Sequence, residues 1–558
     1  MRKRNRDEKM YQEALTKLPE VMRSLGYTDL RDVQKKCFES ILAGEDTFCI
    51  LPTGGGKTLL AIVPTLVFEW RTVIFSPLLA LMQNQVTNYL ARGVKIGTVN
   101  SLQHDNLNTQ AIQDWINGDL QVLLIAPEQI NNGVLKNAMR LVPPNMVVLD
   151  EAHSVSRWGL NFRPSYKECG KFIEEFNPRM VLAMTATAKQ RVVDDVLDIL
   201  KMKEAVVQKY YYPRHNLKLS SVIVADTAKS HSMIISDVKE FLDSGESGSV
   251  IIYCSHTSHC GDLAIELSTH GIESRVYHSK ISDTDREAAM NAFMSNTVRV
   301  IIATNAFGMG VDKPDIRRII HADPPLTLEA VAQETGRASR DGKEGICIMY
   351  GTDDGLQTQL NLFDQSNPAG TTLQFVYEYL RSYAENYIAY VPITDLEQFP
   401  EVGKASSTCF SMLTSLNVIG RPDPPKNIRV KFLKDIHAGA SAGITPLKEK
   451  LLAEIKENGI LEGEYYVYNL PKLAERTGMK ESNLRTHLSG MHKLNVVDYI
   501  APSRVKPSVI LRDLTDEDMK VADDARAEAL KEIQQVRAYL STPDNQKQRL
   551  LDDYFVIK

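Results

Sequence analysis

The sequence predicts an α/β chain with two tandem doubly wound parallel sheets, followed by helical and winged-helix-like C-terminal domains. Two observations lead to this prediction. Short apolar runs alternate with helical patterns from residue 46 to about 205, and the same alternation restarts at 249. Strands that are buried on both faces of a parallel sheet are continuous apolar runs of this kind, and the helices between them form the crossovers.

Five apolar runs mark the strands of each sheet. An N-terminal helical segment, 1–45, precedes the first set, which covers 46–52, 72–77, 122–127, 146–153 and 180–188. The second set comprises SVIIYC, SRVYH, VRVIIAT, RRIIHAD and GICIMY. We therefore expect a first lobe over 1–205 and a second lobe over 206–352.

The chain changes character after the second lobe. Residues 353–427 are helical with turn-rich interruptions, which predicts a helical connector. Within an expected domain over 428–515, a strand-like YYVYN precedes two helical patterns with helix-turn-helix spacing around Gly478. Strand-like segments follow and favour a winged variant, and 516–558 is expected to be a helical tail. The alternative is a helical hairpin that only braces the lobes.

The composition limits the classes of function. No apolar run reaches the roughly 20 residues that a membrane helix needs, and the basic N-terminus is not followed by the apolar stretch of a secretory signal. The seven cysteines include no CxxC pair, so we expect a reducing compartment, cytoplasmic or, in a eukaryote, nuclear, and no membrane partner. The net charge is −5, so any contact with nucleic acid must come from local basic patches.

A glycine-rich turn before a predicted helix indicates a phosphate-binding loop. In LPTGGGKTLL (51–60) a concave row of backbone N–H groups can surround phosphates, formed by Thr53, Gly54, Gly55 and Gly56. Lys57 would neutralise the β- and γ-phosphates of ATP, and the Thr58 hydroxyl would bind Mg²⁺. Leu51 stands where the strict pattern has its first glycine, and the alternative is a chance glycine turn.

Two adjacent acids end a predicted strand of the same lobe, in VVLDEAH (147–153). Asp150 would hold the Mg²⁺, and Glu151 would orient and deprotonate the attacking water. His153 would sense the γ-phosphate, unless it is a structural histidine. A solvated loop end is the alternative for the two acids.

Two arginines in the second lobe complete the expected catalytic set. QETGRASR (333–340) places Arg337 and Arg340 at i and i+3, which predicts one face of a helix. An arginine from a second lobe reaches the transition-state charge only when the lobes close, so hydrolysis would report closure. The alternative is a pair of surface arginines.

These blocks resemble, in order and spacing, those of superfamily-two helicases and in particular the RecQ family. LGYTDLRDVQ (25–34) resembles the RecQ segment that grips adenine, which implies that Gln34 reads the base edge and that Arg31 lies near it. DEAHSVSRWGLNFRPSY (150–166) resembles the RecQ aromatic-rich loop. AFGMGVDKPDIRRIIHADPP (306–325) and QETGRASRDG (333–342) resemble the fifth and sixth motifs. The resemblance implies two RecA-like lobes and an ATP-dependent DNA helicase that moves 3′ to 5′ on single-stranded and forked DNA.

The resemblance also implies residues that contact DNA or couple it to ATP. Trp158, Phe162 and Arg163 would stack on unpaired bases close to Glu151, unless Trp158 is a core residue. Other positions inherit expected roles: DNA phosphate contacts by Ser76, Gln83 and His278, coupling by Thr185 and Thr187, and nucleotide contacts by Gly310 and Asp312. Each of these can instead be structural.

The chain departs from the RecQ pattern near its end. No cysteine follows Cys409, so the family's four-cysteine zinc module is not expected, and no zinc is expected. AYLSTPDNQKQRLLDDYF (538–555) nevertheless resembles the helical stretch of that module. The same tail fits the sliding-clamp peptide pattern at Gln548, Leu551, Tyr554 and Phe555, with an amphipathic packing helix as the alternative.

Other functions remain open at the level of sequence. They are a DNA translocase or remodeller that does not separate strands, an RNA helicase, and an ATP-gated scaffold. The complete set of Lys57, Asp150, Glu151 and Arg340 argues against a scaffold, because a scaffold needs no activated water.

Overall fold

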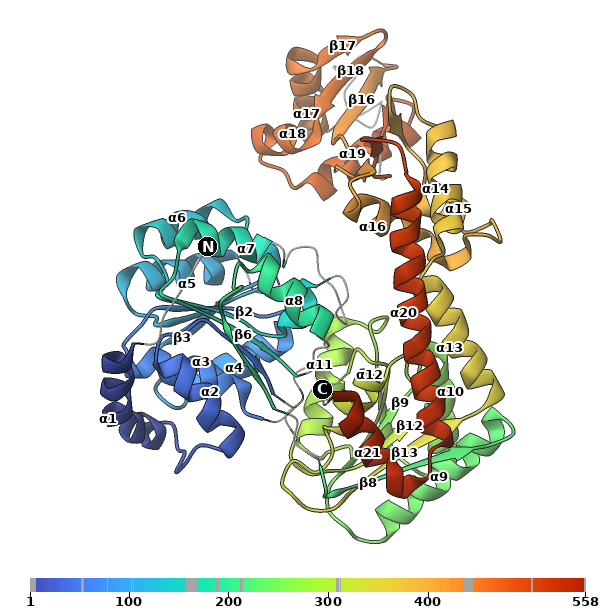
Figure 1. Cartoon of the computed structure of the whole chain (residues 1–558). Coiled ribbons are helices and arrows are strands. Elements are labelled where there is room, and N and C mark those ends of the chain that lie inside the picture. Colours follow the sequence, from blue (N-terminus) through green and yellow to red (C-terminus); the bar gives the residue numbers. More distant parts are fainter. Residues whose placement is uncertain are drawn as a thin grey trace. The chain divides into compact units, whose positions relative to one another are not determined.

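The computed structural model describes residues 7–51, 55–77, 79–101, 103, 105–156, 166, 168–186, 190–210, 214–307, 311, 313–422, 424–434, 445–502 and 505–555. The chain divides into two compact units, 1–361 with 530–558, and 362–529 (Figure 1). The first unit holds two parallel sheets with helices on both faces, which confirms the two predicted RecA-like lobes. Within the described stretches, no helix has both the length and the apolar character needed to cross a membrane.

The first lobe is built on a seven-stranded parallel sheet of order β3-β4-β2-β5-β6-β1-β7. Its strands are β1 (Thr47–Ile50), β2 (Thr72–Phe75), β3 (Ile96–Val99), β4 (Val122–Ile125), β5 (Met146–Leu149), β6 (Met180–Thr185) and β7 (Val206–Lys209). Its helices are α1 (Glu8–Ser24), α2 (Asp32–Leu42), α3 (Lys57–Val67), α4 (Leu79–Leu90), α5 (Asp105–Asn117), α6 (Gly133–Leu141), α7 (Glu168–Phe176) and α8 (Gln190–Ile199), with short 3₁₀ turns η1 (Pro127–Gln129) and η2 (Ala152–Val155).

Both faces of this sheet are buried. Alternate residues of a strand enter opposite cores, so that Val73 and Phe75 of β2 join the core with α5 to α8 while Ile74 joins the core with α1 to α4. This double burial is why the five predicted runs are continuous and apolar, and all five are strands. The strands at the two sheet edges, β3 and β7, were not predicted, because an edge strand carries fewer apolar residues.

The boundary between the lobes lies later than predicted. β7 pairs in parallel with β1, so residues 206–209 belong to the first sheet. The next strand, β8 (Leu217–Ile223), belongs to the second sheet. The predicted boundary after residue 205 is therefore wrong, and the join falls between the two strands.

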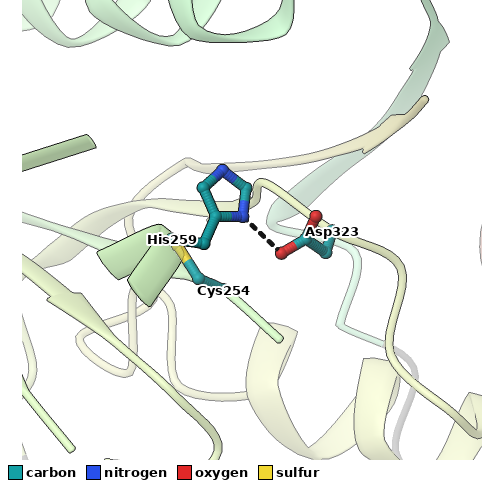
Figure 2. Close-up of side chains that lie close together, drawn as sticks. All are labelled: Cys254, His259 and Asp323. Atoms are coloured by element: carbon teal, nitrogen blue, oxygen red, sulfur yellow. Dashed lines mark hydrogen bonds and ion pairs between the residues drawn. The ribbon is translucent and has the colours of Figure 1, made fainter. Parts of the chain in front are cut away.

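The second lobe has a six-stranded parallel sheet of order β10-β11-β9-β12-β13-β8. The strands that follow β8 are β9 (Ser249–Tyr253), β10 (Ser274–Tyr277), β11 (Val300–Ala303), β12 (Ile316–His321) and β13 (Gly345–Gly351), and the helices are α9 (Thr227–Asp243), α10 (Thr257–Thr269), α11 (Asp283–Met294) and α12 (Leu328–Thr335). The carboxyl ends of β9 and β12 bring Cys254 and Asp323 beside His259 of α10 (Figure 2).

The C-terminal helices α20 (Asp516–Ser541) and α21 (Asp544–Phe555) complete this lobe. Val536, Tyr539, Leu540 and Leu551 are buried in its core. The Ser221 hydroxyl of β8 donates a hydrogen bond to the Leu540 carbonyl at 2.7 Å. Residues 530–555 therefore belong to the second lobe, and the prediction of a separate tail is wrong, because the apolar face of the tail supplies core that the sheet lacks.

This packing accounts for the sliding-clamp pattern. Leu551 is 2% exposed in the lobe core. The Tyr554 hydroxyl donates to Glu532 at 2.7 Å, and Gln548 donates to Asp552 at 2.8 Å. The side chain of Phe555 lies outside the described residues. The alternative of an amphipathic packing helix is therefore confirmed for Leu551, which is not available to a partner in this structure.

The second unit contains two small sheets. In the first, β20 (Ser508–Ile510) lies between β14 (Ile388–Ala389) and β15 (Ile419–Gly420) and packs with α14 (Gly370–Ser382), α15 (Ile393–Leu396) and α16 (Ser406–Ser415). The second has the order β17-β18-β16-β19, formed by β16 (Asn427–Phe432), β17 (Ile460–Glu462), β18 (Tyr465–Asn469) and β19 (Val497–Ile500). Three helices pack on it: α17 (Pro446–Asn458), α18 (Leu470–Thr477) and α19 (Glu481–Lys493). A further helix, α13 (Asp353–Ser366), follows β13.

The helix pair α18 and α19 lies where the helix-turn-helix spacing predicted it. Gly478 ends α18 with φ +70°, a left-handed conformation that glycine adopts without strain. Leu484, Leu488 and Met491 of α19 are fully buried. The trailing strands differ from the prediction: β19 pairs with β16, whereas β20 joins the other sheet. They form no common wing, because each completes a sheet that began earlier in the chain.

We expect Leu551→Ala to destabilise the second lobe, because it removes a side chain that is 2% exposed in the core. A loss of about 2–5 kcal/mol in the free energy of unfolding is usual for such a cavity. Hydrogen exchange of the β8 amides would measure it. The matched control is Leu530→Ala, whose side chain is 39% exposed on α20 and whose effect should stay within about 0.5 kcal/mol. Equal effects of the two changes would show that the tail does not stabilise this lobe.

Candidate active site

The site of the first lobe forms where α3 begins and β5 ends. The Lys57 ammonium donates to Glu151 Oε1 at 3.4 Å, and both side chains are largely buried, at 13% and 15% exposure. Parallel strands direct their carboxyl ends to one edge of a sheet, which brings these two residues together although they are far apart in the sequence. Two of the predicted catalytic residues therefore meet.

The described part of the glycine loop has the conformation that a phosphate cradle needs. Gly56 has φ +74° at the start of α3, so a side chain here would be strained. The Gln34 amide lies directly on this turn and donates to the Gly55 and Gly56 carbonyls at 3.2 and 3.3 Å. Gln34 also accepts from the Arg31 N–H at 2.9 Å. The segment expected to bind the base thus contacts the phosphate loop, as a nucleotide site requires.

The pKa values of the two acids that follow β5, Asp150 and Glu151, shift in opposite directions. Burial, together with the neighbouring Glu151 charge, raises the pKa of Asp150 to about 6 against the opposing charge of Lys57. Burial also disfavours the charge of Glu151, but the Lys57 ammonium outweighs it and lowers the pKa of Glu151. One ammonium therefore compensates one of the two carboxylates. The other carboxylate is available to a divalent cation, and the side chains of Asp150 and Thr58 carry oxygen atoms of the kind that Mg²⁺ prefers.

Glu151 is held in an uncommon conformation. Its φ of +47° is left-handed, which side chains other than glycine rarely adopt outside constrained sites. In the part of the chain that the structure describes, its buried Oε2 accepts no hydrogen bond. This oxygen is therefore an acceptor with unused capacity, as the activation of a water molecule demands.

His153 connects this loop to the end of β6. Its Nδ1 lies 2.7 Å from the Thr185 hydroxyl, and both residues are buried. Burial lowers the pKa of His153, so the ring is neutral at pH 7. Its approach to Glu151 Oε2 at 3.4 Å is then no ion pair. The structure thus joins His153 and Thr185, which the sequence had only placed in separate motifs.

Two residues of this site were not singled out from the sequence. Gln85 of α4 donates to the Thr58 hydroxyl at 3.2 Å, whereas the predicted Gln83 is exposed. The fully buried Tyr166 donates to the Asp150 carbonyl at 3.1 Å. Both lie within motif segments, but composition alone does not tell which polar side chain of a helix or loop faces the core.

The arginines of the second lobe lie on a turn. α12 ends at Thr335, and Ser339 has φ +44°, so the predicted helical face is wrong. A left-handed residue between Arg337 and Arg340 interrupts any helix. Arg337 is buried, and Arg340 donates to the Val311 carbonyl at 2.9 Å.

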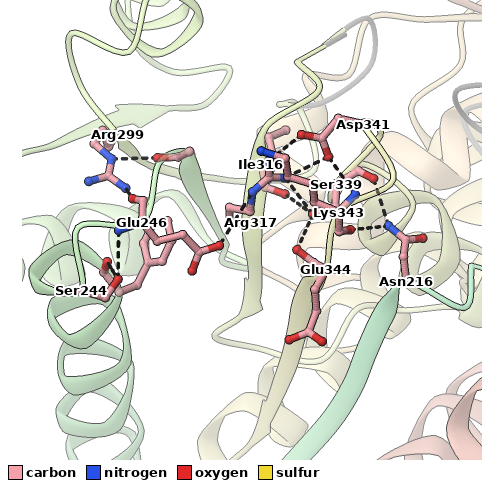
Figure 3. Close-up of polar contacts among 12 residues, drawn as sticks. Asn216, Ser244, Glu246, Arg299, Ile316, Arg317, Ser339, Asp341, Lys343 and Glu344 are labelled. Atoms are coloured by element: carbon pink, nitrogen blue, oxygen red, sulfur yellow. Dashed lines mark hydrogen bonds and ion pairs between the residues drawn. The ribbon is translucent and has the colours of Figure 1, made fainter.

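Two further arginines hold this turn. Arg317 donates to the Ser339 hydroxyl at 3.0 Å and forms an ion pair with Asp341 (Figure 3). Arg214 donates to the carbonyls of Ala338 and Ser339 at 2.7 and 3.0 Å. A guanidinium offers several donors in one plane, which suits it to fixing a turn. The turn is therefore fixed within its own lobe.

The remaining predicted positions differ in what the structure reports. Ser76 is fully buried at the end of β2, so its hydroxyl is not accessible to DNA in this structure. His278 follows β10 and is half-buried. The following lie outside the described residues: Thr53, Gly54, Trp158, Phe162, Arg163, Thr187, Gly310 and Asp312.

The raised pKa of Asp150 predicts a pH-dependent gain in stability for Asp150→Asn in the nucleotide-free chain. The folded pKa of about 6 exceeds the ordinary value of 3.8, so between these values the native state binds more protons than the unfolded chain. Wild-type stability should fall as the pH rises from about 4 to about 6 and stay lower above it. At pH 7 the buried charge costs about 2–3 kcal/mol, which asparagine avoids.

Hydrogen exchange of the β5 amides at pH 4 and pH 7 would measure this difference. Asparagine retains the oxygen that accepts the Glu151 N–H at 3.0 Å. The exposed Asp119 of the same lobe provides the control Asp119→Asn, for which no such gain is expected. Wild type and Asp150→Asn with parallel pH profiles would contradict the raised pKa.

Two family descriptions match the two lobes. The DEAD/DEAH box helicase family matches residues 31–196, and the helicase conserved C-terminal domain matches residues 233–342. Solved helicase structures share the fold at low identity. A Mycobacterium smegmatis helicase Lhr bound to ssDNA and AMP-PNP aligns over 80% of this chain and 63% of its own, at 16% identity and a TM-score of 0.51. S. cerevisiae Dbp5 bound to RNA and ADP BeF3 aligns over 65% and 93%, at 16% identity and a TM-score of 0.50.

Curated relatives are closer in sequence. The protein named "Probable ATP-dependent DNA helicase RecS" of Bacillus subtilis is 36% identical over 60% of this chain and 67% of its own length. The ATP-dependent helicase SGS1 of Saccharomyces cerevisiae is 36% identical over 61% and 23%, and the ATP-dependent DNA helicase RecQ of Pasteurella multocida is 32% identical over 58% and 50%. The chain thus spans from about a quarter to two thirds of these relatives. With its two lobes and their motifs, the chain belongs to the RecQ-like family of superfamily-two helicases.

Proposed function

We propose that this protein is an ATP-dependent DNA helicase that moves 3′ to 5′ along single-stranded DNA and separates the strands of forked DNA. The observation that carries the proposal is the buried Lys57–Glu151 pair beside Asp150, because it supplies a phosphate-binding cation, a water activator and a metal ligand at one sheet edge. The relatives at 32–36% identity named as DNA helicases support DNA as the substrate.

The hydrolytic step follows from the charges of this chain. Asp150 and Thr58 would hold Mg²⁺ when it binds with ATP, and the ion would supply neutralisation of phosphate charge. Lys57 then exchanges Glu151 for the phosphates, which leaves the Glu151 carboxylate to orient the attacking water and take its proton. Arg337 and Arg340, fixed on their turn, stabilise the charge of the transition state when the lobes close.

Coupling to DNA is proposed through the segment that follows the catalytic acids. This segment, 157–165, begins directly after η2, and its far end is tied back by the hydrogen bond from Tyr166 to the Asp150 carbonyl. We propose that bases stacked on Trp158, Phe162 and Arg163 influence Asp150 through the neighbouring Tyr166. The His153–Thr185 bond would carry the state of the nucleotide to the end of β6.

A translocase that does not separate strands is the second candidate, since it needs the same ATP site and the same coupling to DNA through residues 157–165. RNA is less favoured as a substrate, because Dbp5, whose structure was solved bound to RNA, shares only the fold with this chain. A sliding-clamp contact is not proposed, since Leu551 is buried.

Tailed duplexes test the proposed activity. In the presence of ATP, wild type should separate DNA duplexes with a 3′ overhang, and leave duplexes with a 5′ overhang and RNA duplexes intact.

Glu151→Gln should bind ATP but hydrolyse it roughly 10²–10⁴-fold more slowly, because it removes the water activator. Lys57→Ala should lose nucleotide binding. Near-wild-type turnover in Glu151→Gln would refute the assignment, and DNA-stimulated ATPase without strand separation would establish the translocase.

The helix pair of the second unit is proposed to contact the duplex. Lys480, Asn483 and Lys493 are exposed, whereas Arg485 and His487 flank the buried face of α19 and are half-buried. Phosphate contacts by such side chains release counterions, so the affinity depends steeply on salt.

We expect Lys480→Glu with Arg485→Glu to weaken binding to forked duplexes and to reduce the salt slope by about 2. ATPase stimulated by single-stranded DNA should persist. The control is Lys520→Glu with Lys531→Glu, an equal charge change at exposed positions of α20. If both double variants keep the wild-type slope, α19 is a brace and the duplex is bound elsewhere.

A further inference from the structure

The carboxyl edge of the second sheet holds a polar cluster that the proposed function does not use. Four side chains form a row of hydrogen bonds. Glu266 Oε1 lies 2.8 Å from His231 Nδ1, His231 Nε2 lies 2.7 Å from His259 Nε2, and His259 Nδ1 lies 2.7 Å from Asp323 Oδ2. The Asp323 end of the row is held by the Ser255 N–H, which also donates to Asp323 Oδ2 at 2.9 Å.

The row lacks one positive centre. An ionised carboxylate only accepts hydrogen bonds, and a neutral imidazole has one N–H and one acceptor nitrogen. Two neutral rings thus supply two N–H groups for the three contacts of Glu266, His231, His259 and Asp323. Once the ring N–H groups of His231 and His259 both point toward Glu266, the nitrogen of His259 and the oxygen of Asp323 face each other as two acceptors. A positive centre is needed here: either a proton on His259, whose pKa burial lowers but the hydrogen bond and charge of Asp323 raise overall, or a metal ion that binds both atoms once they move apart from 2.7 Å.

The neighbouring thiol indicates a metal ion. The sulfur of Cys254, one ring nitrogen of His259 and one carboxylate oxygen of Asp323 all lie within 4.8 Å of one another. Figure 2 shows His259 hydrogen-bonded to Asp323, with Cys254 close to the histidine. A proton between His259 and Asp323 would need no sulfur. Zn²⁺ takes thiolate, imidazole and carboxylate together, and three protein ligands leave its fourth position for solvent.

The rest of the row then acts as support for the ligand. A metal-bound histidine usually donates its second N–H to an acceptor that fixes the ring. Here His259 Nε2–H would donate to His231, whose Nδ1–H would donate to Glu266, and no group of the row is left unsatisfied. Cys254 and Asp323 are 4% and 7% exposed, while the His259 side chain is 16% exposed and leaves a way in for the ion.

We propose that Cys254, His259 and Asp323 form a Zn²⁺ site in the second lobe, with His231 and Glu266 orienting His259. The site would tie the ends of β9 and β12 to the first turn of α10. It departs from the expectation of no zinc, which considered only cysteine pairs close in sequence. It is also distinct from a four-cysteine module, since it uses one thiol.

Cobalt substitution of the full chain tests the site without ATP or DNA, so its result is independent of helicase activity. After removal of metals by a chelator, Co²⁺ should bind at about one ion per chain with thiolate-to-cobalt charge-transfer absorption, and Zn²⁺ should displace it. All seven cysteines are buried, so no thiol on the surface can bind Co²⁺ nonspecifically and give this band. Cys254→Ser should abolish the band. Cys347→Ser, at another buried thiol of the same lobe, should retain it.

His231→Ala separates support from ligation. It should keep the band but weaken Co²⁺ binding by roughly 10–100-fold, as expected for loss of a supporting hydrogen bond. Should Cys254→Ser fail to fold, the wild type still decides, because Zn²⁺ must then raise its thermal midpoint as a ligand of the native state does. A wild type without the charge-transfer band, or a band that persists in Cys254→Ser, would overturn the proposal and leave a proton between His259 and Asp323.

Discussion

The first lobe is organised around the compensation of two adjacent buried carboxylates by a single ammonium. Asp150 and Glu151 directly follow the same strand, and Lys57 from the start of α3 forms an ion pair with Glu151 at 3.4 Å. The unmatched charge would be compensated by a divalent cation, because burial in a low dielectric makes an uncompensated carboxylate costly. The parallel sheet makes this arrangement possible by ending its strands at one edge.

In the second lobe, by contrast, arginine charges are used to fix a backbone turn. Arg317 and Arg214 are committed to Asp341 and to backbone carbonyls, so their role is to hold the turn that carries the two motif arginines. Because the turn is already ordered, its arginines would lose little entropy when they contact a charge that develops in a reaction, which is the advantage of preorganisation. The first lobe thus has one buried carboxylate more than its ammonium compensates, and the second lobe carries two arginines on a turn fixed by hydrogen bonds.

Much of this fold follows from the sequence, and the failures have physical causes. Strands buried on both faces were predicted because their apolar runs are unbroken, whereas the edge strands β3 and β7 were not. The candidate catalytic residues Lys57, Asp150 and Glu151 could be proposed from the sequence because glycine turns and paired acids are local patterns. Gln85 and Tyr166 were missed because tertiary packing decides which polar side chain turns inward. Cys254, His259 and Asp323 escaped notice because they meet only through the order of strands in the sheet.

The placement of the C-terminal helices has a consequence for how the chain is made. Residues 362–529 interrupt the second lobe, whose core is completed by Val536, Tyr539 and Leu551. During synthesis from the N-terminus, the first lobe has all of its strands before the second lobe is finished, and the inserted unit also emerges first. The second lobe must wait for the last helices with an apolar face uncovered. Its dependence on residues 530–555 therefore prolongs the exposure of apolar surface that favours aggregation of a nascent chain.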